Sequence, residues 1–174
     1  MAKLSVQDLN LQGKLVLVRV DFNVPLCGGK VADDTRIKAA LPTLNYILDQ
    51  GGRPILMSHL GRPGGKVVPQ MSLKPVAKCL DELVEQSVLM IPDCVGEAVV
   101  SQVKGAPEGV VVLLENLRFH PGEEENSPEF AIKLAELSEV YVNDAFGTAH
   151  RAHASTEGIT HYVVDCACGL LMEK

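Results

Sequence analysis

Short apolar segments recur along the chain without the alternation that marks a strand with one exposed face. They are rich in valine and leucine, are of strand length, and cover residues 15–20, 54–57, 88–91, 110–114, 140–142 and 162–164. Continuous apolar runs of this kind are typical of strands in a parallel sheet whose two faces are both covered by helices. The pattern therefore predicts about six strands in one parallel sheet.

Segments with helical spacing lie between these runs. Their apolar residues are three or four positions apart: Ile37, Leu41, Leu44 and Leu48, then Leu73, Val76, Leu80, Leu83 and Val84, and finally Phe130, Leu134 and Leu137. Ser127, Pro128 and Glu129 suit the cap and first turn of the third helix. Pro42 cannot donate a helix hydrogen bond, so we expect a kink there or a helix whose main body starts there.

Alternating strands and helices predict an α/β fold. We expect a Rossmann-like domain of three layers, with a parallel sheet of about six strands between helices on both faces. The chain has 174 residues, of which 47% are hydrophobic, which is enough for a single compact domain. In such a sheet, ligands bind in the crevice outside the carboxyl ends of the strands.

Charge and cysteine content narrow the classes of function. Sixteen lysines and arginines against 22 acidic residues give a net charge of −6, so no overall positive field attracts nucleic acid or an anionic membrane. Five scattered cysteines fit reduced thiols better than a disulfide scaffold. No apolar run approaches the roughly 20 residues that span a bilayer, and residues 1–8 lack the apolar core of a signal peptide. We expect a soluble, cytoplasmic protein.

Basic or hydrogen-bonding residues follow four of the predicted strands and open the first helix. They are Asp21, Asn23, Arg36, His59, Arg62, Arg118 and Arg151. An arginine fork binds carboxylate or phosphate oxygens in pairs and stays charged at any working pH. A lone arginine is more often an ordinary surface or ion-paired residue, but several on one rim of a sheet predict a site for a small, multiply charged anion.

Some of these residues also have an ordinary structural interpretation. Asp21 and Asn23 belong to types that form turns, and His59 alone could equally be a satisfied structural histidine. The glycine-rich segment 61–66 could be only a turn. It is not a phosphate-binding P-loop, because it lacks both the spacing and the hydroxyl residue of that motif.

Two further clusters are interpreted without a functional role. The acidic run Glu123–Glu124–Glu125 is typical of a solvated loop. Cys166 and Cys168 occur with histidines at positions 150, 153 and 161, but they lack the paired spacing of familiar zinc sites. We therefore expect no metal site in this chain.

Five sequence blocks resemble the signatures of the phosphoglycerate kinase family, and they occur in that family's order. They are VRVDFNVP (18–25), DDTRI (33–37), SHLGRP (58–63), ENLRF (115–119) and NDAFGTAHR (143–151). The resemblance covers the chain from Leu15 to its end. It implies a two-domain, hinge-bending glycolytic enzyme that transfers a phosphoryl group between 1,3-bisphosphoglycerate and ADP, with magnesium carried on the nucleotide.

The resemblance also implies roles for individual residues. The substrate-binding set would be Asp21, Asn23, Arg36, His59, Leu60, Gly61, Arg62, Arg118 and Arg151. Asp21 and Asn23 would bind the glycerate portion, and the arginines with His59 would form a basic patch. Arg36 would also be the catalytic arginine that stabilises the transition state.

The chain stops where members of this family enter a hinge helix and a second domain. We therefore expect residues 1–174 to be the single amino-terminal, substrate-binding domain, ending at the start of the hinge region. This domain would bind 3-phosphoglycerate and 1,3-bisphosphoglycerate as a monomer, without turnover. It would hold no cofactor, because Mg-ATP or Mg-ADP would be bound by its partner, the carboxyl-terminal domain.

Three alternatives come from other classes of function. The first is a non-catalytic glycerate-binding module or interaction module derived from the enzyme. The second, a structural domain with a degraded site, is disfavoured because every matched position has the expected residue type. The third, a dinucleotide-binding dehydrogenase, is weaker because no G-x-G-x-x-G motif follows the first predicted strand.

Overall fold

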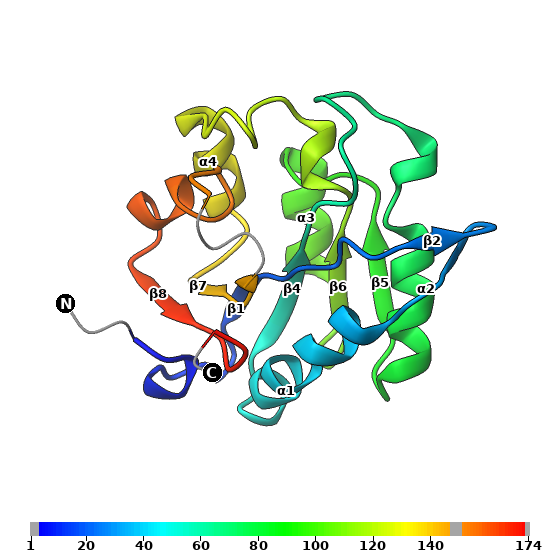
Figure 1. Ribbon diagram of the computed structural model, residues 1–174. Helices are drawn as coiled ribbons and strands as arrows, with labels where there is room; N and C mark the ends of the chain where they lie inside the picture. Colours follow the sequence, from blue (N-terminus) through cyan, green and yellow to red (C-terminus); the bar gives the residue numbers. More distant parts are fainter. Residues whose placement is uncertain (1–3, 147–150, 173–174) are drawn as a thin grey trace.

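Six parallel strands form the central sheet of the computed structural model, which describes residues 4–146 and 151–172 (Figure 1). The strands are β1 (Leu15–Arg19), β4 (Arg53–Met57), β5 (Val88–Ile91), β6 (Val111–Leu114), β7 (Val140–Asn143) and β8 (Asp165–Cys168). Their spatial order is β5-β6-β4-β1-β7-β8, and every neighbouring pair is parallel. The predicted Rossmann-like α/β fold is confirmed.

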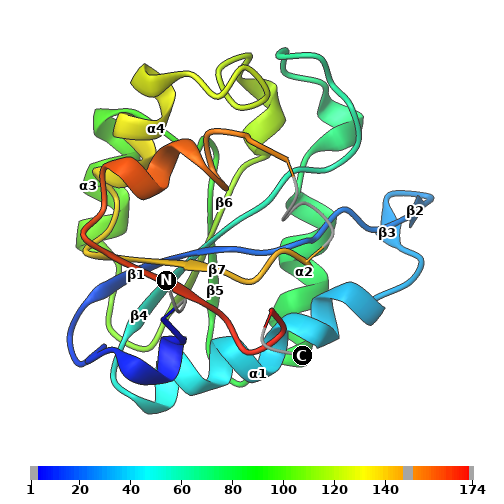
Figure 2. The same ribbon diagram turned by 60° about the vertical axis from the view of Figure 1, so that its left-hand side comes forward.

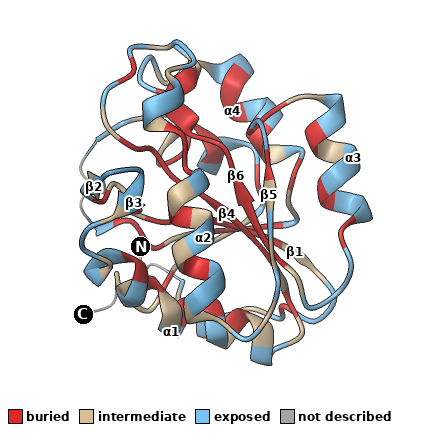
Figure 3. Cartoon of the chain, turned by 90° about the vertical axis from the view of Figure 1, so that its right-hand side faces the viewer, coloured by how far each residue is buried: buried red, intermediate tan, exposed pale blue. Residues whose placement is uncertain are grey.

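Two pairs of helices cover the sheet, one pair on each face (Figure 2). Helices α1 (Thr35–Asp49) and α2 (Lys74–Leu83) share a core with Val16 and Val18 of β1. Helices α3 (Glu97–Gly105) and α4 (Pro128–Ala135) share the other core with Leu17. Successive side chains of β1 are thus buried on opposite faces, which explains why its sequence is a continuous apolar run. Figure 3 shows the inner strands β4 and β6 coloured mainly as buried.

The helices largely follow the predicted spacing. Ser127 caps α4, where its hydroxyl oxygen accepts a hydrogen bond from the Phe130 N–H at 3.4 Å, as predicted. Helix α1 begins at Thr35 and continues through Pro42, so its main body does not start at the proline. No helix among the described residues is long and apolar enough to cross a membrane.

The sequence pattern missed several elements. These are α3, a short antiparallel hairpin of β2 (Leu26–Cys27) and β3 (Lys30–Val31), and the 3-10 helices η1 (Val6–Asp8), η2 (Pro69–Met71), η3 (Leu117–Phe119) and η5 (Gly158–His161). The two turn residues of the hairpin, Gly28 and Gly29, have φ of 59° and 75°. Such positive φ values are those of the tight turns that favour glycine at both central positions.

The sixth strand was predicted in the wrong place. Residues 162–164 follow η5, and Val164 is 98% exposed. The strand is instead Asp165–Cys168, at the sheet edge, where it pairs with β7 and where Cys168 donates its N–H to the Leu4 carbonyl at 2.8 Å. An edge strand with partly exposed side chains does not need a continuous apolar run, so the signal for it was weak.

A buried ion pair lies at the carboxyl edge of β1. Arg19, the last residue of that strand, and Glu123 are both fully buried, with Arg19 Nη2 3.9 Å from Glu123 Oε2. The interpretation of the acidic run as solvated surface is therefore wrong for Glu123, although Glu124 and Glu125 are exposed. A carboxylate is retained in the interior here because it faces a charge that needs compensation.

Further hydrogen bonds complete this buried network. Arg19 Nε donates to the Ser155 hydroxyl at 2.8 Å, and Arg19 Nη2 lies 3.0 Å from Nδ1 of His59. The Ser155 N–H donates to Glu123 Oε1 at 2.9 Å, and the Tyr141 hydroxyl donates to the Ser155 carbonyl at 2.6 Å. Burial, followed by the charge of Arg19, lowers the pKa of His59 to about 2. The imidazole is therefore neutral in the folded chain.

We predict that Glu123→Gln destabilises the fold by about 3 kcal/mol, because removing one partner of a buried pair leaves the other charge uncompensated. Urea denaturation at neutral pH measures the change. Glu124→Gln, at the exposed neighbouring position, is the matched control and should change the free energy of unfolding by less than about 0.5 kcal/mol. Equal effects of the two substitutions would contradict the role assigned to the ion pair.

We also predict a pH-dependent loss of stability that originates at His59. Its folded pKa of about 2 lies below the ordinary value of 6.5, so the unfolded chain binds the extra proton. The stabilisation of the folded chain that comes from the low pKa of His59 is fully present above pH 6.5. It is lost as the pH falls below that value, by about 1.4 kcal/mol per pH unit. His59→Asn keeps a hydrogen-bond acceptor near the Nδ1 position but does not titrate.

Urea denaturation of both proteins from pH 7.5 to 5.0 tests this prediction. The stability of the parent minus that of the His59→Asn variant should fall by about 2 kcal/mol over this range. Parallel pH profiles would contradict this prediction, because they would show that His59 has the same pKa in the folded and in the unfolded chain.

Candidate functional site

Eight residues from five segments line one cavity of about 260 Å³ at the carboxyl edge of the sheet. They are Asp21, Asn23, Arg36, His59, Gly61, Arg62, Arg118 and Arg151. The segments follow β1, β4, β6 and β7, which are adjacent in the order β6-β4-β1-β7, or open α1. All predicted site residues except Leu60 thus lie together. Leu60 is 4% exposed and belongs to the hydrophobic core.

Arg118 is the most deeply buried cation of the cavity. It is 3% exposed, and its Nη1 donates to the Gly61 carbonyl at 3.3 Å. Within the described part of the chain, its buried Nε and Nη2 atoms have no hydrogen-bond partner. Burial is the main cause of the lowered pKa of Arg118, but a guanidinium remains charged in proteins. Unpaired donors on a buried cation are costly, so they indicate a position for an anionic ligand.

Asn116 holds the loop after β4 against Arg118. Its side-chain oxygen accepts hydrogen bonds from the N–H groups of Leu60 at 3.2 Å and Arg118 at 3.0 Å. Its amide nitrogen donates to the carbonyls of Leu60 at 2.8 Å and Met71 at 2.9 Å. Leu60 thus contributes to the site through its backbone, which fixes the neighbouring Gly61 carbonyl that Arg118 contacts.

Glu115 holds Asn116 in position through a hydrogen bond to its backbone. Its carboxylate accepts hydrogen bonds from the Ser72 hydroxyl at 2.6 Å and from the N–H groups of Leu73 at 2.8 Å and Asn116 at 2.9 Å. The sequence analysis gave neither Glu115 nor Asn116 a role. The one available signal was their position directly after a buried strand.

The contact with Arg19 determines the tautomer of His59. An arginine can only donate, so Nδ1 of His59 must accept the hydrogen bond from Arg19 Nη2. The single proton of the neutral ring is then on Nε2. His59 therefore offers a neutral N–H donor to the cavity, in a ring held in place by a residue that sequence reasoning missed.

Asp21, Asn23 and Arg36 form a further part of the cavity lining. Arg36 Nη1 donates to the Asn23 carbonyl at 2.7 Å and lies 3.4 Å from Asp21 Oδ1. The Asn23 side-chain oxygen accepts from the Gly61 N–H at 2.9 Å, which leaves its NH₂ group for a ligand. The Arg36 side chain is 56% exposed. Arg36 and Asp21 also line a second cavity of about 410 Å³, so the two cavities adjoin.

The lining favours small anions over cations. Four arginines face the cavity against the single carboxylate of Asp21, and Arg62 and Arg151 are exposed and free to adjust to a ligand. This local positive charge exists in a chain of net charge −6. It repels a free divalent metal ion and attracts carboxylate or phosphate groups.

Two sequence features lie elsewhere. Residues 147–150, part of the last sequence block and including His150, lie outside the described residues. The group of three potential metal ligands found in the described part of the chain is Asp93, Cys94 and His120. None of these three residues lines the anion cavity.

Comparisons with known proteins agree with the fold and the sequence blocks. The family model described as phosphoglycerate kinase matches residues 6–174. The phosphoglycerate kinase of Chlorobium luteolum is 60% identical over 175 residues, and that of Moorella thermoacetica is 59% identical over 174 residues. Each alignment covers 100% of this chain, which spans 44% of the length of either relative.

Two solved structures are also similar to this chain, and both are phosphoglycerate kinases. The structure of phosphoglycerate kinase from Coxiella burnetii matches with a TM-score of 0.87 and 42% identity, over 99% of this chain and 42% of that one. The enzyme from Pyrococcus horikoshii matches with a TM-score of 0.88 and 34% identity, over 98% of this chain and 43% of that one. The chain therefore belongs to the phosphoglycerate kinase family, and it corresponds to the amino-terminal region of that family.

Proposed function

We propose that residues 1–174 form a single substrate-binding domain, and that the cavity between Asp21 and Arg151 binds 3-phosphoglycerate and 1,3-bisphosphoglycerate. The observation that carries this proposal is the buried guanidinium of Arg118, whose Nε and Nη2 atoms have no partner among the described residues. A ligand oxygen would satisfy these donors. Three further arginines line the same cavity and could share the charge of such a ligand.

The other lining groups match the remaining chemistry of a phosphorylated glycerate. Asp21 offers an acceptor for a ligand hydroxyl, and Asn23 offers its amide NH₂ group. His59 adds an N–H donor whose neutrality is independent of pH in the working range. Arginine forks would hold the carboxylate and the phosphate at fixed positions.

Catalysis by the complete enzyme would then rest on positioning and charge. In the direction that consumes ATP, the nucleophile is the ligand's own carboxylate, which is ionised at neutral pH, so no general base is required. Arg36 is the proposed catalytic residue. It lies where the two cavities adjoin, and its exposed guanidinium could approach the transferring phosphoryl group. Fixed positive donors at that point stabilise the spreading negative charge.

The nucleotide belongs to a part of the family that this chain does not include. We assign Mg-ATP and Mg-ADP to a carboxyl-terminal domain, because the cationic cavity described here has no set of oxygen ligands for magnesium. Binding without turnover is the resulting proposal for the 174-residue chain. The monomeric state and the cytoplasmic location expected from the sequence remain predictions.

We predict that Arg62→Ala and Arg118→Ala each weaken 3-phosphoglycerate binding by about 1.5–3 kcal/mol, the range for hydrogen bonds to charged groups. Arg→Lys at either position should recover only part of the loss, because an ammonium group cannot replace the planar fork. Calorimetric titration measures the affinities. Lys104→Ala removes one exposed cation from α3, away from the cavity, and should leave the affinity unchanged. Unchanged affinity in both arginine-to-alanine variants would exclude this cavity as the binding site.

We further predict that the chain alone does not turn over. A coupled assay with ATP and 3-phosphoglycerate should show no activity until a separately expressed carboxyl-terminal half is added. In-line transfer requires the γ-phosphate and its magnesium to be held against the bound carboxylate, and closure of the second domain would do this. Substantial turnover by the purified chain, free of full-length enzyme, would overturn this division of roles.

A further inference from the structure

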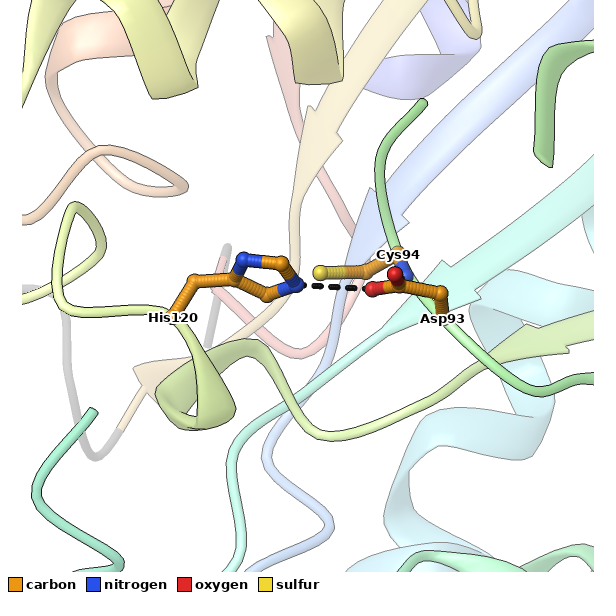
Figure 4. Close-up of side chains that lie close together, drawn as sticks. All are labelled: Asp93, Cys94 and His120. Carbon is orange, nitrogen blue, oxygen red and sulfur yellow. Dashed lines mark hydrogen bonds and ion pairs between the residues drawn. The ribbon is translucent and has the colours of Figure 1, made fainter. Parts of the chain in front are cut away.

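Three potential metal ligands meet at the carboxyl edge of β5 and β6 (Figure 4), and none of them lines the anion cavity. A carboxylate oxygen of Asp93, the sulfur of Cys94 and a ring nitrogen of His120 all lie within 4.8 Å of one another. Asp93 and Cys94 follow β5, whereas His120 follows η3. Two segments distant in sequence thus bring sulfur, nitrogen and oxygen ligands to one point.

The spacing of these atoms is close to that of a zinc site. Bonds of about 2.0–2.3 Å in a tetrahedral arrangement place ligand atoms about 3.3–3.6 Å apart. At present Nε2 of His120 lies 2.7 Å from Oδ1 of Asp93, so this pair would have to open slightly. The sulfur would have to move inward from a separation of at most 4.8 Å.

Cys94 supplies a buried thiol to this cluster of potential ligands. Cys94 is fully buried and is not in a disulfide. Burial raises the pKa of this thiol well above its ordinary value. A bound cation would supply the charge that stabilises a thiolate at this buried position.

Access for an ion comes from the other two ligands. The side chains of Asp93 and His120 are 51% and 32% exposed, so the cluster has one solvent-facing side. A water molecule could occupy the fourth tetrahedral position there. One thiolate and one carboxylate would balance the two charges of the cation, so that burial of the sulfur leaves no net local charge.

We propose that Asp93, Cys94 and His120 form a Zn²⁺-binding site. Thiolate and imidazole ligands select zinc over magnesium or calcium, which prefer oxygen ligands. On binding, the thiol proton of Cys94 is released to solvent. Nε2 of His120 donates to the Asp93 carboxylate at 2.7 Å in the metal-free chain, so on metal binding Nε2 gives its proton to solvent while Nδ1 takes one up. The Nε2 lone pair is then directed at the metal. No electron transfer or additional reactant is involved.

Bound zinc would link the loop after β5 to the segment after η3. The Asp93 carbonyl accepts a hydrogen bond from the Glu115 N–H at 3.4 Å, and the His120 carbonyl accepts one from the Glu123 N–H at 3.3 Å. Through these two backbone hydrogen bonds, the metal would be linked to Glu115 and Glu123, which lie on either side of Arg118 in the sequence. It would stabilise the folded chain by mass action, since the unfolded chain does not hold the three ligands together.

Titration of the metal-free 174-residue chain with Zn²⁺, monitored by calorimetry, tests the site. We expect one Zn²⁺ per chain and no displacement by excess Mg²⁺. Cys94→Ala and His120→Gln should each lower the zinc affinity by at least about 100-fold, since loss of an outer-sphere partner alone costs about 10–100-fold. Co²⁺ serves as a spectroscopic probe and should give a thiolate charge-transfer absorption that Cys94→Ala abolishes.

Two matched controls separate this site from adventitious binding. His161→Gln removes a histidine that contacts Glu157 at 2.8 Å but belongs to no group of three ligands within the described chain. Cys166→Ala removes a different, partly exposed thiol. Both should retain the parent affinity.

The opposite pattern would overturn the proposal. Absence of saturable binding at one Zn²⁺ per chain would do so, as would full affinity in both the Cys94 and the His120 variants. If Cys94→Ala does not fold, His120→Gln decides alone, because the partly exposed His120 can be replaced without opening the core.

Discussion

A guanidinium without access to water lies at the end of the central strand β1, and the arrangement of the candidate site depends on how that charge is compensated. Arg19 is fully buried, so it requires a counterion and hydrogen-bond acceptors from other parts of the chain. Glu123 supplies the charge, Ser155 accepts from Nε, and His59 accepts from Nη2. These partners come from three separate segments, so a single buried arginine fixes the loop after β4, the segment after η3 and the segment that leads to η5.

The sheet order explains why residues far apart in sequence meet at one cavity. Strands β6, β4, β1 and β7 are adjacent and parallel, so the segments that follow them leave the sheet at the same edge. The apolar runs predicted these strands, and the residues directly after them predicted the lining of the cavity. This inference succeeded because it required only the direction of each strand. Leu60 was the exception, since its side chain enters the core while its backbone carries the hydrogen bonds to Asn116.

Features that depend on tertiary partners could not be predicted from local sequence. Glu123 stands next to two exposed glutamates, and only the position of Arg19 explains why it is buried while Glu124 is not. Strand β8 contains Asp165 and two cysteines, a composition that gives no apolar signal. The ligand cluster of Asp93, Cys94 and His120 joins two loops that are separated in sequence, so no local spacing motif predicts it. In each case the missing information was which segment would lie opposite.

The two buried arginines show how such partners separate a structural role from a ligand-binding one. Arg19 ends a strand and Arg118 follows one. The position of Arg118 after its strand made it a candidate site residue, but the sequence did not predict that either arginine is buried. Arg19 has a counterion and acceptors for its donors, so a further anion would gain little there. Arg118 has one long contact to a carbonyl and two buried nitrogens without partners in the described chain. A buried donor without a partner costs about 1–3 kcal/mol, and more when the group is charged. An anion that accepts hydrogen bonds from Arg118 would remove this cost, and this gain would contribute to its binding free energy.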